Sequence, residues 1–527
     1  MDTRTPAFIS RLRARFVIAV LVACLLAPAL GFAGAGGPAP DGAPFTRSYE
    51  YDPTFAADGI AIDHFAGSNT ADFVGRKLVR LDNGDVVVAG LATRSGFPAP
   101  DQIGLVRYNA AGQRVAWSAV SAAYGEFGNQ YVVYPKGNSG QPIGSFTELI
   151  DVQEYGGNLY VLANLRTVLN DVRPIFVVFS TTGVHRGWWT WYPSNNAPAR
   201  GFIIQTVATQ GARIVMVGDE PAPSGPVTTP RIWMARLAIG ANGTLALDAG
   251  FGNGGFAYSR GVACTTAATA QSCPTWAAAI ASEPGPVVST NPKFYVAVSV
   301  RRNNQTLDGL VLRFNGNGSR DLDFAISSTG YDEAVIAFDD GGNDADVPVA
   351  MATGYHIEIP LAYVDDIYVA ANVSRATRPG IGLVRFDGEG DLDPAFGTGG
   401  RTLFGGCGTG TGNCNFFNVE AVAWSMARDG NRLAIGGRYR GFLDQSGSDF
   451  FTYPLFAVID AGSGSVVNFD EYPTGEGDGA FYGVVANGDG RFTLAGDVES
   501  IVTGGSLSYL TARIAPLDDR IFANGFE

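Results

Sequence analysis

A strand-like phrase that recurs seven times constrains the fold of this chain more than any other feature. Each copy opens on a small turn, continues as a β-rich apolar run and usually ends on Ala or Gly. The copies lie at 83–90, 157–163, 211–218, 293–298, 366–371, 430–437 and 490–496. Repetition of one short unit at a regular period is the mark of a repeat architecture. We therefore expect seven equivalent structural units.

Two further strands flank each copy of the phrase. Alternating runs such as 73–79 and 419–424 come before it. After a variable loop, a third strand follows at 103–108, 174–179, 232–237, 310–314, 381–386, 455–459 and 509–514. Five of these third strands keep an arginine near their end, namely Arg107, Arg236, Arg313, Arg385 and Arg513. Short alternating runs bounded by turn residues predict antiparallel strands.

A Leu-Asp-x-x-Phe-Gly-x-x-Gly phrase marks the fourth strand of a unit. It is clearest at 392–400, recurs at 247–255 and is eroded at 321–324. We interpret Asp393, Phe396, Gly397, Gly399 and Gly400 as a structural motif of the repeat. The glycines suit tight turns with positive φ, and the phenylalanine suits packing between sheets.

The run at 385–397 resembles the delta-60 repeat, a bacterial repeat whose units form propeller blades, and weaker versions cover most of 51–514. The resemblance implies an all-β fold, a β-propeller, and it brings no catalytic residues with it. Four strands in each of seven units predict seven four-stranded blades. The phrase at 51–60 has no three strands before it, and the seventh unit has no complete phrase after it. We therefore predict that the N-terminal strand joins the last blade and closes the ring.

The N-terminal residues predict export. Residues 1–35 have a basic start, an apolar run at 16–30 and small residues at 33–35, which is typical of a signal peptide. No later segment is long and apolar enough for a transmembrane span. We expect a flexible segment at 36–45, the propeller at 46–516 and a short tail at 517–527, in a secreted or periplasmic protein.

The net charge restricts the class of binding partner, and the cysteine count predicts disulfides. The net charge of −14 argues against nucleic acid, because phosphate binding needs clustered Lys and Arg. We expect a monomer. An even count of cysteines in an exported chain predicts two disulfides, Cys264 with Cys273 and Cys407 with Cys414. Zinc is the alternative, although no histidine lies near either pair and neither spacing matches a zinc motif.

Two clusters are candidates for ligand contact. Asp339, Asp340, Asp344 and Asp346 lie in a glycine-rich stretch, and oxygen ligands in such loops suit Ca²⁺. A solvated turn is the alternative, and no other cofactor is predicted. Trp188, Trp189 and Trp191 fall within one predicted strand, where alternation places Trp188 on one face and Trp189 and Trp191 on the other. Packing between blades is favoured for them, and stacking on a sugar is the alternative.

No catalytic set is apparent. His64, His185 and His356 lie in three different units without a motif partner, so we expect each on a loop or strand surface. The sequence favours a non-catalytic binding or scaffold protein, with a carbohydrate or protein partner at the cell surface. The alternative is a polysaccharide hydrolase or lyase that uses acidic loop residues at the channel mouth. Convergence of two carboxylates at one mouth would favour the enzyme.

Overall fold

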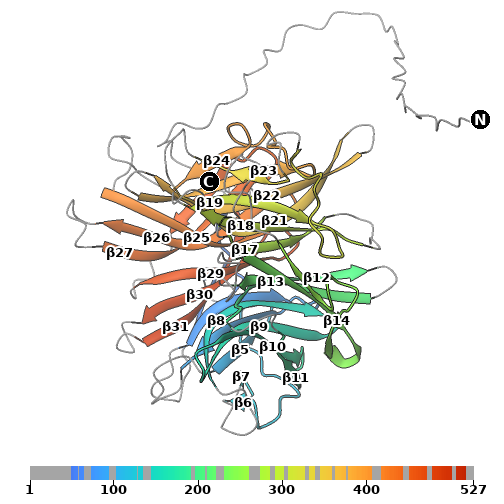
Figure 1. The fold of residues 1–527 in the computed structure, drawn as a ribbon. Helices are drawn as coiled ribbons and strands as arrows, with labels where there is room; N and C mark the ends of the chain where they lie inside the picture. The colour runs from blue at the N-terminus through green and yellow to red at the C-terminus, as the bar shows by residue number, and fades with distance from the viewer. Residues whose placement is uncertain are drawn as a thin grey trace, which may run out of the picture. The chain divides into compact units, whose positions relative to one another are not determined.

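Seven antiparallel β-sheets follow one another along the chain in the computed structural model (Figure 1). The structure describes residues 49–56, 58–63, 73–93, 102–126, 129–134, 144–191, 196–207, 211–220, 231–259, 273, 275–284, 291–301, 307–326, 332–338, 345–358, 362–375, 378–405, 417–442, 450–471, 478–500 and 506–517. The predicted signal peptide and the segment at 36–45 lie outside this part, as does the tail beyond 517. Within it, no helix is long and apolar enough to cross a membrane.

Each sheet is one blade, and its strands are ordered from the inner edge of the ring outward. Blade 1 contains β3 (Phe73–Arg80), β4 (Val86–Ala92), β5 (Gln102–Tyr108), β7 (Tyr131–Tyr134) and β6 (Gly125–Glu126). Blade 2 contains β8 (Gly144–Tyr155), β9 (Asn158–Thr167), β10 (Val172–Ser180) and β11 (His185–Trp189). Blade 3 contains β12 (Ala199–Val207), β13 (Gly211–Glu220), β14 (Arg231–Ile239) and β15 (Leu245–Leu247), with β16 (Phe256–Tyr258) also paired to β14 and a short 3₁₀ turn, η1 (Ala241–Gly243).

The remaining four blades keep the same plan. Blade 4 contains β17 (Thr275–Ser282), β18 (Phe294–Arg301), β19 (Leu307–Phe314) and β20 (Ala334–Ile336). Blade 5 contains β21 (Asp346–Glu358), β22 (Ala362–Arg375), β23 (Arg378–Asp387) and β24 (Arg401–Phe404). Blade 6 contains β25 (Phe417–Asp429), β26 (Arg432–Phe442), β27 (Phe450–Asp460) and β28 (Val466–Glu471). Blade 7 contains β29 (Gly479–Ala486), β30 (Phe492–Ser500) and β31 (Ser506–Pro516), completed by β1 (Tyr49–Tyr51) and β2 (Ile60–Asp63).

The blades form a closed ring. The inner strands contact one another in the order β3, β8, β12, β17, β21, β25, β29 and back to β3. The N-terminal strands β1 and β2 both pair antiparallel with β31, the last strand of the chain. The predicted seven-bladed propeller and its closure by the N-terminal strand are therefore confirmed.

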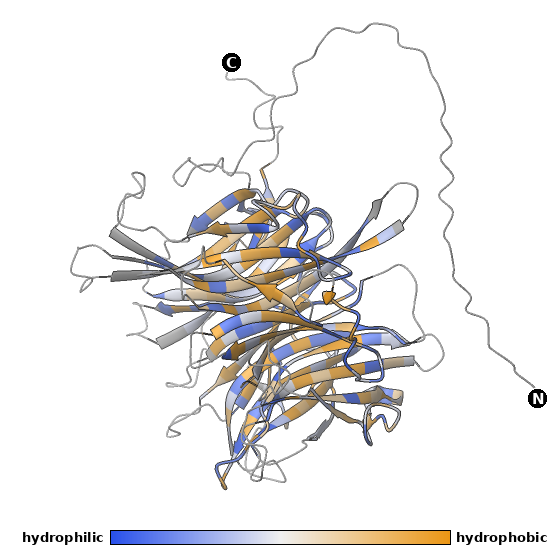
Figure 2. Cartoon of the chain, turned by 45° about the horizontal axis from the view of Figure 1, so that its top comes forward, coloured by the Kyte–Doolittle hydropathy of each residue, from blue (hydrophilic) through white to orange (hydrophobic). Residues whose placement is uncertain are grey.

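Apolar packing between neighbouring sheets holds the ring together. The buried hydrophobic residues fall into seven clusters, and each cluster joins the facing sides of two adjacent blades. The second strand of a blade, such as β4, is buried along its whole length because both of its faces meet another sheet. Hydrophobic residues, which are orange in Figure 2, accordingly lie along the strands. Removal of this apolar surface from water is the main driving force for folding.

In four blades, the arginine of the third strand clips the blade to the next one. In blade 5, the Arg385 guanidinium donates to the Asp393 carboxylate, lies 5.3 Å from the Phe396 ring centroid and donates to the Gly462 carbonyl of blade 6 at 3.0 Å. The same arrangement recurs at Arg236, Arg313 and Arg513. The repeat signature is thus a blade-to-blade hydrogen-bonding device.

Gly397, which follows Phe396 in the repeat motif, allows a backbone conformation with a positive φ. Gly397 has a φ of 53°, and its N–H donates to the Ser463 carbonyl of blade 6 at 2.7 Å. A Cβ at Gly397 would lie 2.0 Å from the Arg401 carbonyl oxygen. Ala56 and Ala325 occupy the same position in other blades with φ values of 51° and 58°. Those two alanines adopt the left-handed region at an energetic cost that glycine avoids.

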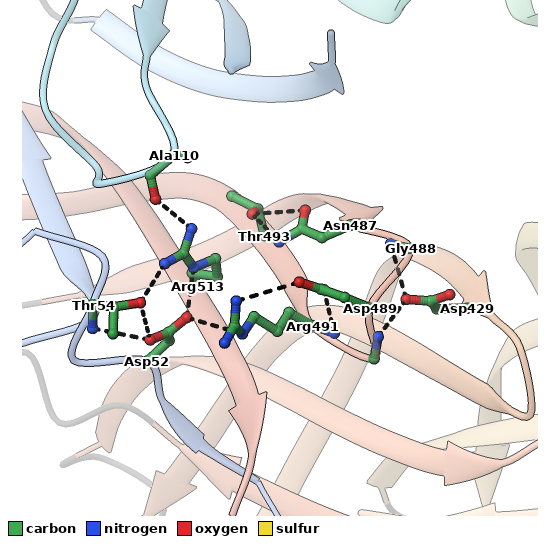
Figure 3. A network of polar contacts seen from close by, with 11 residues as sticks. Asp52, Thr54, Ala110, Asp429, Asn487, Gly488, Asp489, Arg491, Thr493 and Arg513 are labelled. Atoms are coloured by element: carbon green, nitrogen blue, oxygen red, sulfur yellow. Dashed lines mark hydrogen bonds and ion pairs between the residues drawn. The ribbon is translucent and has the colours of Figure 1, made fainter. Parts of the chain in front are cut away.

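The chain ends are joined by the same clip (Figure 3). Arg513 on β31 donates from Nε to Asp52 Oδ2 at 2.7 Å, from Nη2 to Thr54 Oγ1 at 2.8 Å and from Nη1 to the Ala110 carbonyl of blade 1 at 2.5 Å. Arg491 adds a second ion pair to Asp52 at 3.4 Å. Burial alone would raise the pKa of Asp52, but the hydrogen bonds of Thr54 and both arginines bring it below the usual range. A fold-closing contact therefore reuses the repeat motif.

Candidate functional site: the axial cavity

Every inner strand carries a β-bulge at the same level. The extra residue is Arg76, Ile150, Arg200, Ala278, Val349, Trp424 or Tyr482 in blades 1 to 7 respectively. The residue before each bulge pairs with the last residue of the repeated sequence phrase, namely Gly90, Ala163, Gly218, Val298, Ala371, Gly437 or Gly496. A bulge bends the strand locally and redirects its side chains.

In four blades the phrase ends on glycine, which makes room for the bulged strand. A Cβ at Gly496 would lie 1.7 Å from the Ala480 carbonyl oxygen, and one at Gly437 would lie 2.1 Å from the Val422 carbonyl oxygen. No side chain tolerates contacts this short, so glycine permits the close approach of the two backbones. The end of the sequence phrase is therefore tied to the geometry of the central cavity.

Side chains of the second strands fix the bulges to the preceding blade. Asn164 accepts the Ala199 N–H at 2.8 Å and donates to the Ala199 carbonyl at 3.0 Å. Asn372 does the same with Ala423, at 2.8 and 3.1 Å. The equivalent Asp219 accepts the N–H of Ala277 at 2.7 Å. These bonds satisfy backbone groups that the bulge removes from the strand ladder.

A cavity of about 180 Å³ lies where the seven bulges meet. In blades 2 to 6, the extra residue and the residue after it both line the cavity wall. Blades 4 and 5 contribute only apolar residues, which are Ala278, Ala279 and Ile280 in blade 4 and Val349, Ala350 and Met351 in blade 5. The polar lining therefore comes from the other blades, and the cavity is chemically asymmetric although the ring is nearly symmetric.

Charged residues line the cavity on blades 1 to 3. Lys77, Asp151 and Arg200 all face it. Arg200 is neutralised by Asp219 at 2.7 Å and by Glu148 at 3.3 Å. Asp151 accepts the Val152 N–H at 2.9 Å and the Gln153 side-chain amide at 3.0 Å. Burial raises the pKa of Asp151, although the Lys77 charge and these hydrogen bonds act in the opposite direction.

Aromatic rings lie at the bulges of blades 6 and 7. The rings of Trp424 and Tyr482 are 4.6 Å apart, and the Arg76 guanidinium of blade 1 lies 3.9 Å from the Tyr482 centroid. Arg438 lies 5.4 Å from the Trp424 centroid. Cations over aromatic faces are electrostatically favourable. Burial raises the pKa of the neighbouring Asp497 to about 6, against the effects of the Arg76 charge and a hydrogen bond with Tyr482.

The carboxylates near the cavity already have protein partners. Asp151 has both oxygens hydrogen-bonded, and Asp219 uses one oxygen for Ala277 and the other for Arg200. Glu148 binds Arg200 and lies within 3.4 Å of the Asn164 amide. Of the described residues that line the cavity, Asp151 is the one carboxylate. Glycoside hydrolysis generally needs two carboxyl groups at a defined separation across the scissile bond.

The predicted tryptophan cluster lies at the outer strand of blade 2 and not at the cavity. Trp189 and Trp191 pack against the hydrophobic cluster between blades 2 and 3, while Trp188 is 37% exposed. The predicted split between the two faces is therefore correct. The assumption of one strand is wrong for Trp191, because β11 ends at Trp189. Contact of Trp188 with a sugar stays a prediction.

The predicted calcium and disulfide residues lie only partly within the described structure. Asp339, Asp340 and Asp344 lie outside it, and Asp346 is buried at the start of β21, where it accepts the Phe338 N–H at 3.0 Å. No group of three or more His, Cys, Asp or Glu residues suited to a metal occurs in the described ranges. Cys273 is buried in the cluster between blades 3 and 4. Cys264, Cys407 and Cys414 lie outside, so both the calcium site and the two disulfide pairings stay predictions.

The histidines do not approach the cavity together. His185 opens the outer strand β11 and is half-buried, because its ring packs at 4.6 Å from Tyr124 and 5.2 Å from Phe179, and this burial lowers its pKa. His356 is partly exposed and lies 3.0 Å from Asp366. His64 lies outside the described residues.

Sequence reasoning missed Arg76, Lys77 and Asp151. A strand read by simple alternation puts consecutive residues on opposite faces. The bulge interrupts this alternation at one position of the inner strand. The one sequence signal for it is the small residue that usually ends the phrase of the neighbouring strand.

Comparisons with known proteins give structural likeness at low identity. No family model and no curated protein sequence matches the chain. A protein of unknown function from Dyadobacter fermentans aligns with a TM-score of 0.37 at 10% identity, over 87% of this chain and 100% of that one. The GH93 α-L-arabinofuranosidase of Fusarium graminearum, solved with arabinobiose, aligns at 0.35 and 10%, over 74% and 93%. An apocarotenoid oxygenase of Synechocystis aligns at 0.32 and 11%, over 91% and 96%. The two enzymes among these proteins differ in activity, so the likeness to this chain does not bear on its function.

Proposed function

We propose that this chain is a non-catalytic binding protein that holds a small polar ligand in the axial cavity. The observation that carries the proposal is the asymmetric lining at the bulges. A recess in which a few directed polar groups lie among apolar side chains is the usual form of a ligand site. Asp151 and Asp219, which could otherwise act as acids or bases, already use both oxygens in hydrogen bonds within the protein.

A cavity-filling variant tests this proposal. Ala278→Phe adds bulk to the cavity wall, and Thr206→Phe adds the same bulk at an exposed position of another inner strand. The full chain is screened by calorimetry against neutral sugars, sugar acids and small carboxylates. We expect at least one ligand to bind unchanged to Thr206→Phe and at least tenfold more weakly to Ala278→Phe. Binding that is insensitive to Ala278→Phe would refute the cavity as the site.

Polysaccharide hydrolysis is the second candidate function, and one observation favours it. Glu148 and Asp219 converge on Arg200 beside the cavity, so two carboxylates lie near each other. The test is release of reducing ends from a panel of plant and bacterial polysaccharides, with Glu148→Gln as the inactive variant. Turnover that Glu148→Gln abolishes, with the fold intact by circular dichroism, would replace the binding proposal.

We also propose that the chain is exported and that its units are delta-60 repeats. The clip gives a structural role to Arg385, Asp393 and Phe396 of the signature at 385–397, and this supports the second point. N-terminal sequencing of the protein recovered outside the cytoplasm should begin close after residue 35. Recovery in the cytoplasm with residues 1–35 intact would contradict export. Alkylation before and after reduction should show four protected thiols if both disulfides form.

A further inference from the structure

Lys77 and Arg76 form a pair of adjacent cations at the bulge of blade 1. In the register of β3 with β4, Gly75 pairs with Gly90 and Lys77 with Ala89, so Arg76 is the extra residue. An undisturbed strand would send the two side chains to opposite faces. Here Lys77 lines the cavity, and the Arg76 guanidinium lies against Tyr482 of the adjacent blade.

Neither cation forms an ion pair within the described structure, although the Lys77 charge acts on Asp151 and the Arg76 charge on Asp497 from a longer distance. Among the described residues, no Asp or Glu oxygen lies within the 4.0 Å ion-pair distance of Lys77 or Arg76. The nearby Asp151 has both oxygens occupied by hydrogen bonds. By contrast, Arg200 on the same wall is paired at 2.7 Å, and Lys293 in blade 4 is paired with Asp321 at 2.8 Å.

The charge of the whole protein makes this pair unusual. The net charge is −14, so the average surface repels anions, and carboxylates outnumber the basic groups that they could pair with. A partly desolvated cation without a partner costs free energy, which a bound anion would offset. Trp424 extends the cavity wall beside the cations with an aromatic ring, a surface that suits the carbon skeleton of a small ligand.

We infer that the axial cavity binds a small carboxylate, whose charged group lies against Lys77 on β3. This inference rests on the proposed binding function and specifies its ligand class. The Lys77 ammonium would donate to a carboxylate oxygen of the ligand, while the Arg76 guanidinium stays on the Tyr482 ring. The carboxylate could belong to a sugar acid or to an aliphatic acid, and the test separates the two.

The experiment compares two lysines of the full chain. Lys77→Met removes the unpaired cation, and Lys293→Met is the matched control at a paired lysine away from the cavity. The probes are galacturonate and glucuronate, the neutral sugars galactose and glucose, and succinate, all measured by calorimetry. We expect a carboxylate to bind, with affinity lowered about tenfold or more by Lys77→Met and unchanged by Lys293→Met. Circular dichroism and thermal melting confirm that both variants fold.

The outcomes separate the inference from the function on which it rests. Binding of the sugar acids alone assigns the ligand to sugar acids, and equal binding of succinate assigns it to small carboxylates in general. If neutral sugars bind as tightly as their acids, and Ala278→Phe weakens this binding, the inference is overturned. The proposed binding function would then remain intact. Absence of binding by every carboxylate probe, or a carboxylate affinity unchanged by Lys77→Met, would also overturn it.

Discussion

Arg513→Met should open the ring at its closing contact. The substitution keeps the aliphatic stem and removes the bonds to Asp52, Thr54 and Ala110. Asp52 is only 3% exposed, so it would remain as a buried charge. Loss of one partner of a buried ion pair costs about 3–5 kcal/mol. Arg491 stays at 3.4 Å from Asp52, so we expect the lower end, about 3 kcal/mol.

Arg385→Met is the matched control for this prediction. Arg385 makes the same kinds of contact, but its clip joins parts of one continuous segment rather than the two chain ends. Native-state hydrogen exchange by mass spectrometry is the assay, because it resolves local opening. A cost of about 3 kcal/mol corresponds to roughly a hundredfold faster exchange in β1 and β2 if these strands open locally. We expect this change in Arg513→Met and not in Arg385→Met.

Two further results would test the ring-closing clip. Adding Asp52→Asn to Arg513→Met should recover part of the lost stability, because it removes the uncompensated buried charge. If exchange in β1 and β2 is unchanged in Arg513→Met, or rises equally in Arg385→Met, the clip does not hold the ring closed. The apolar packing of Tyr49 and Phe55 would then carry the closure.

Three other predictions concern the repeat and the buried polar groups. Ala56→Gly should stabilise the protein by about 1 kcal/mol because it relieves a positive φ, whereas Gly397→Ala should destabilise it, both by urea denaturation. Asn372→Leu should cost about 1–3 kcal/mol in the same assay, because the Ala423 N–H and carbonyl lose their partner inside the ring. Burial raises the pKa of Asp497 to about 6, so its stabilising contribution is complete below about pH 4 and is lost as the pH rises through 6. Asp497→Asn should therefore match the parent near pH 4 and exceed it by about 2–3 kcal/mol above pH 7; equal stability at both pH values would contradict the buried charge.

The sequence predicted the ring because the features that build it repeat. The phrase at 392–400 and the arginine of the third strand form one clip, and that clip recurs wherever its residues recur. Apolar runs on both faces of the second strands identified sheets buried on both sides. The N-terminal phrase predicted closure because an incomplete first unit and an incomplete last unit complement each other. These inferences succeed since each depends on local pattern and on the need to bury apolar surface.

The cavity could not be predicted in the same way. A bulge shifts the side-chain period by one residue, and nothing in 73–79 distinguishes a bulged strand from a regular one. Alternation therefore assigns Arg76 and Lys77 to opposite faces. The partial burial of His185 was missed for a related reason, since it depends on Tyr124 and Tyr134 from another blade. Contacts that depend on where two distant segments meet leave little trace in either segment alone.

The bulge positions are where this repeat is free to vary. Clips, phrase-ending small residues and apolar second strands are fixed by the contact of one blade with the next, so they repeat around the ring. The two residues at each bulge differ in chemistry from blade to blade, and blades 4 and 5 show that apolar pairs satisfy the fold there. Charged side chains at the equivalent positions of blades 1 to 3 carry a desolvation cost that packing does not require. Departures from local rules that the fold does not need are expected at functional sites, which is why the axial cavity, rather than the exposed Trp188, is the place to look for the ligand.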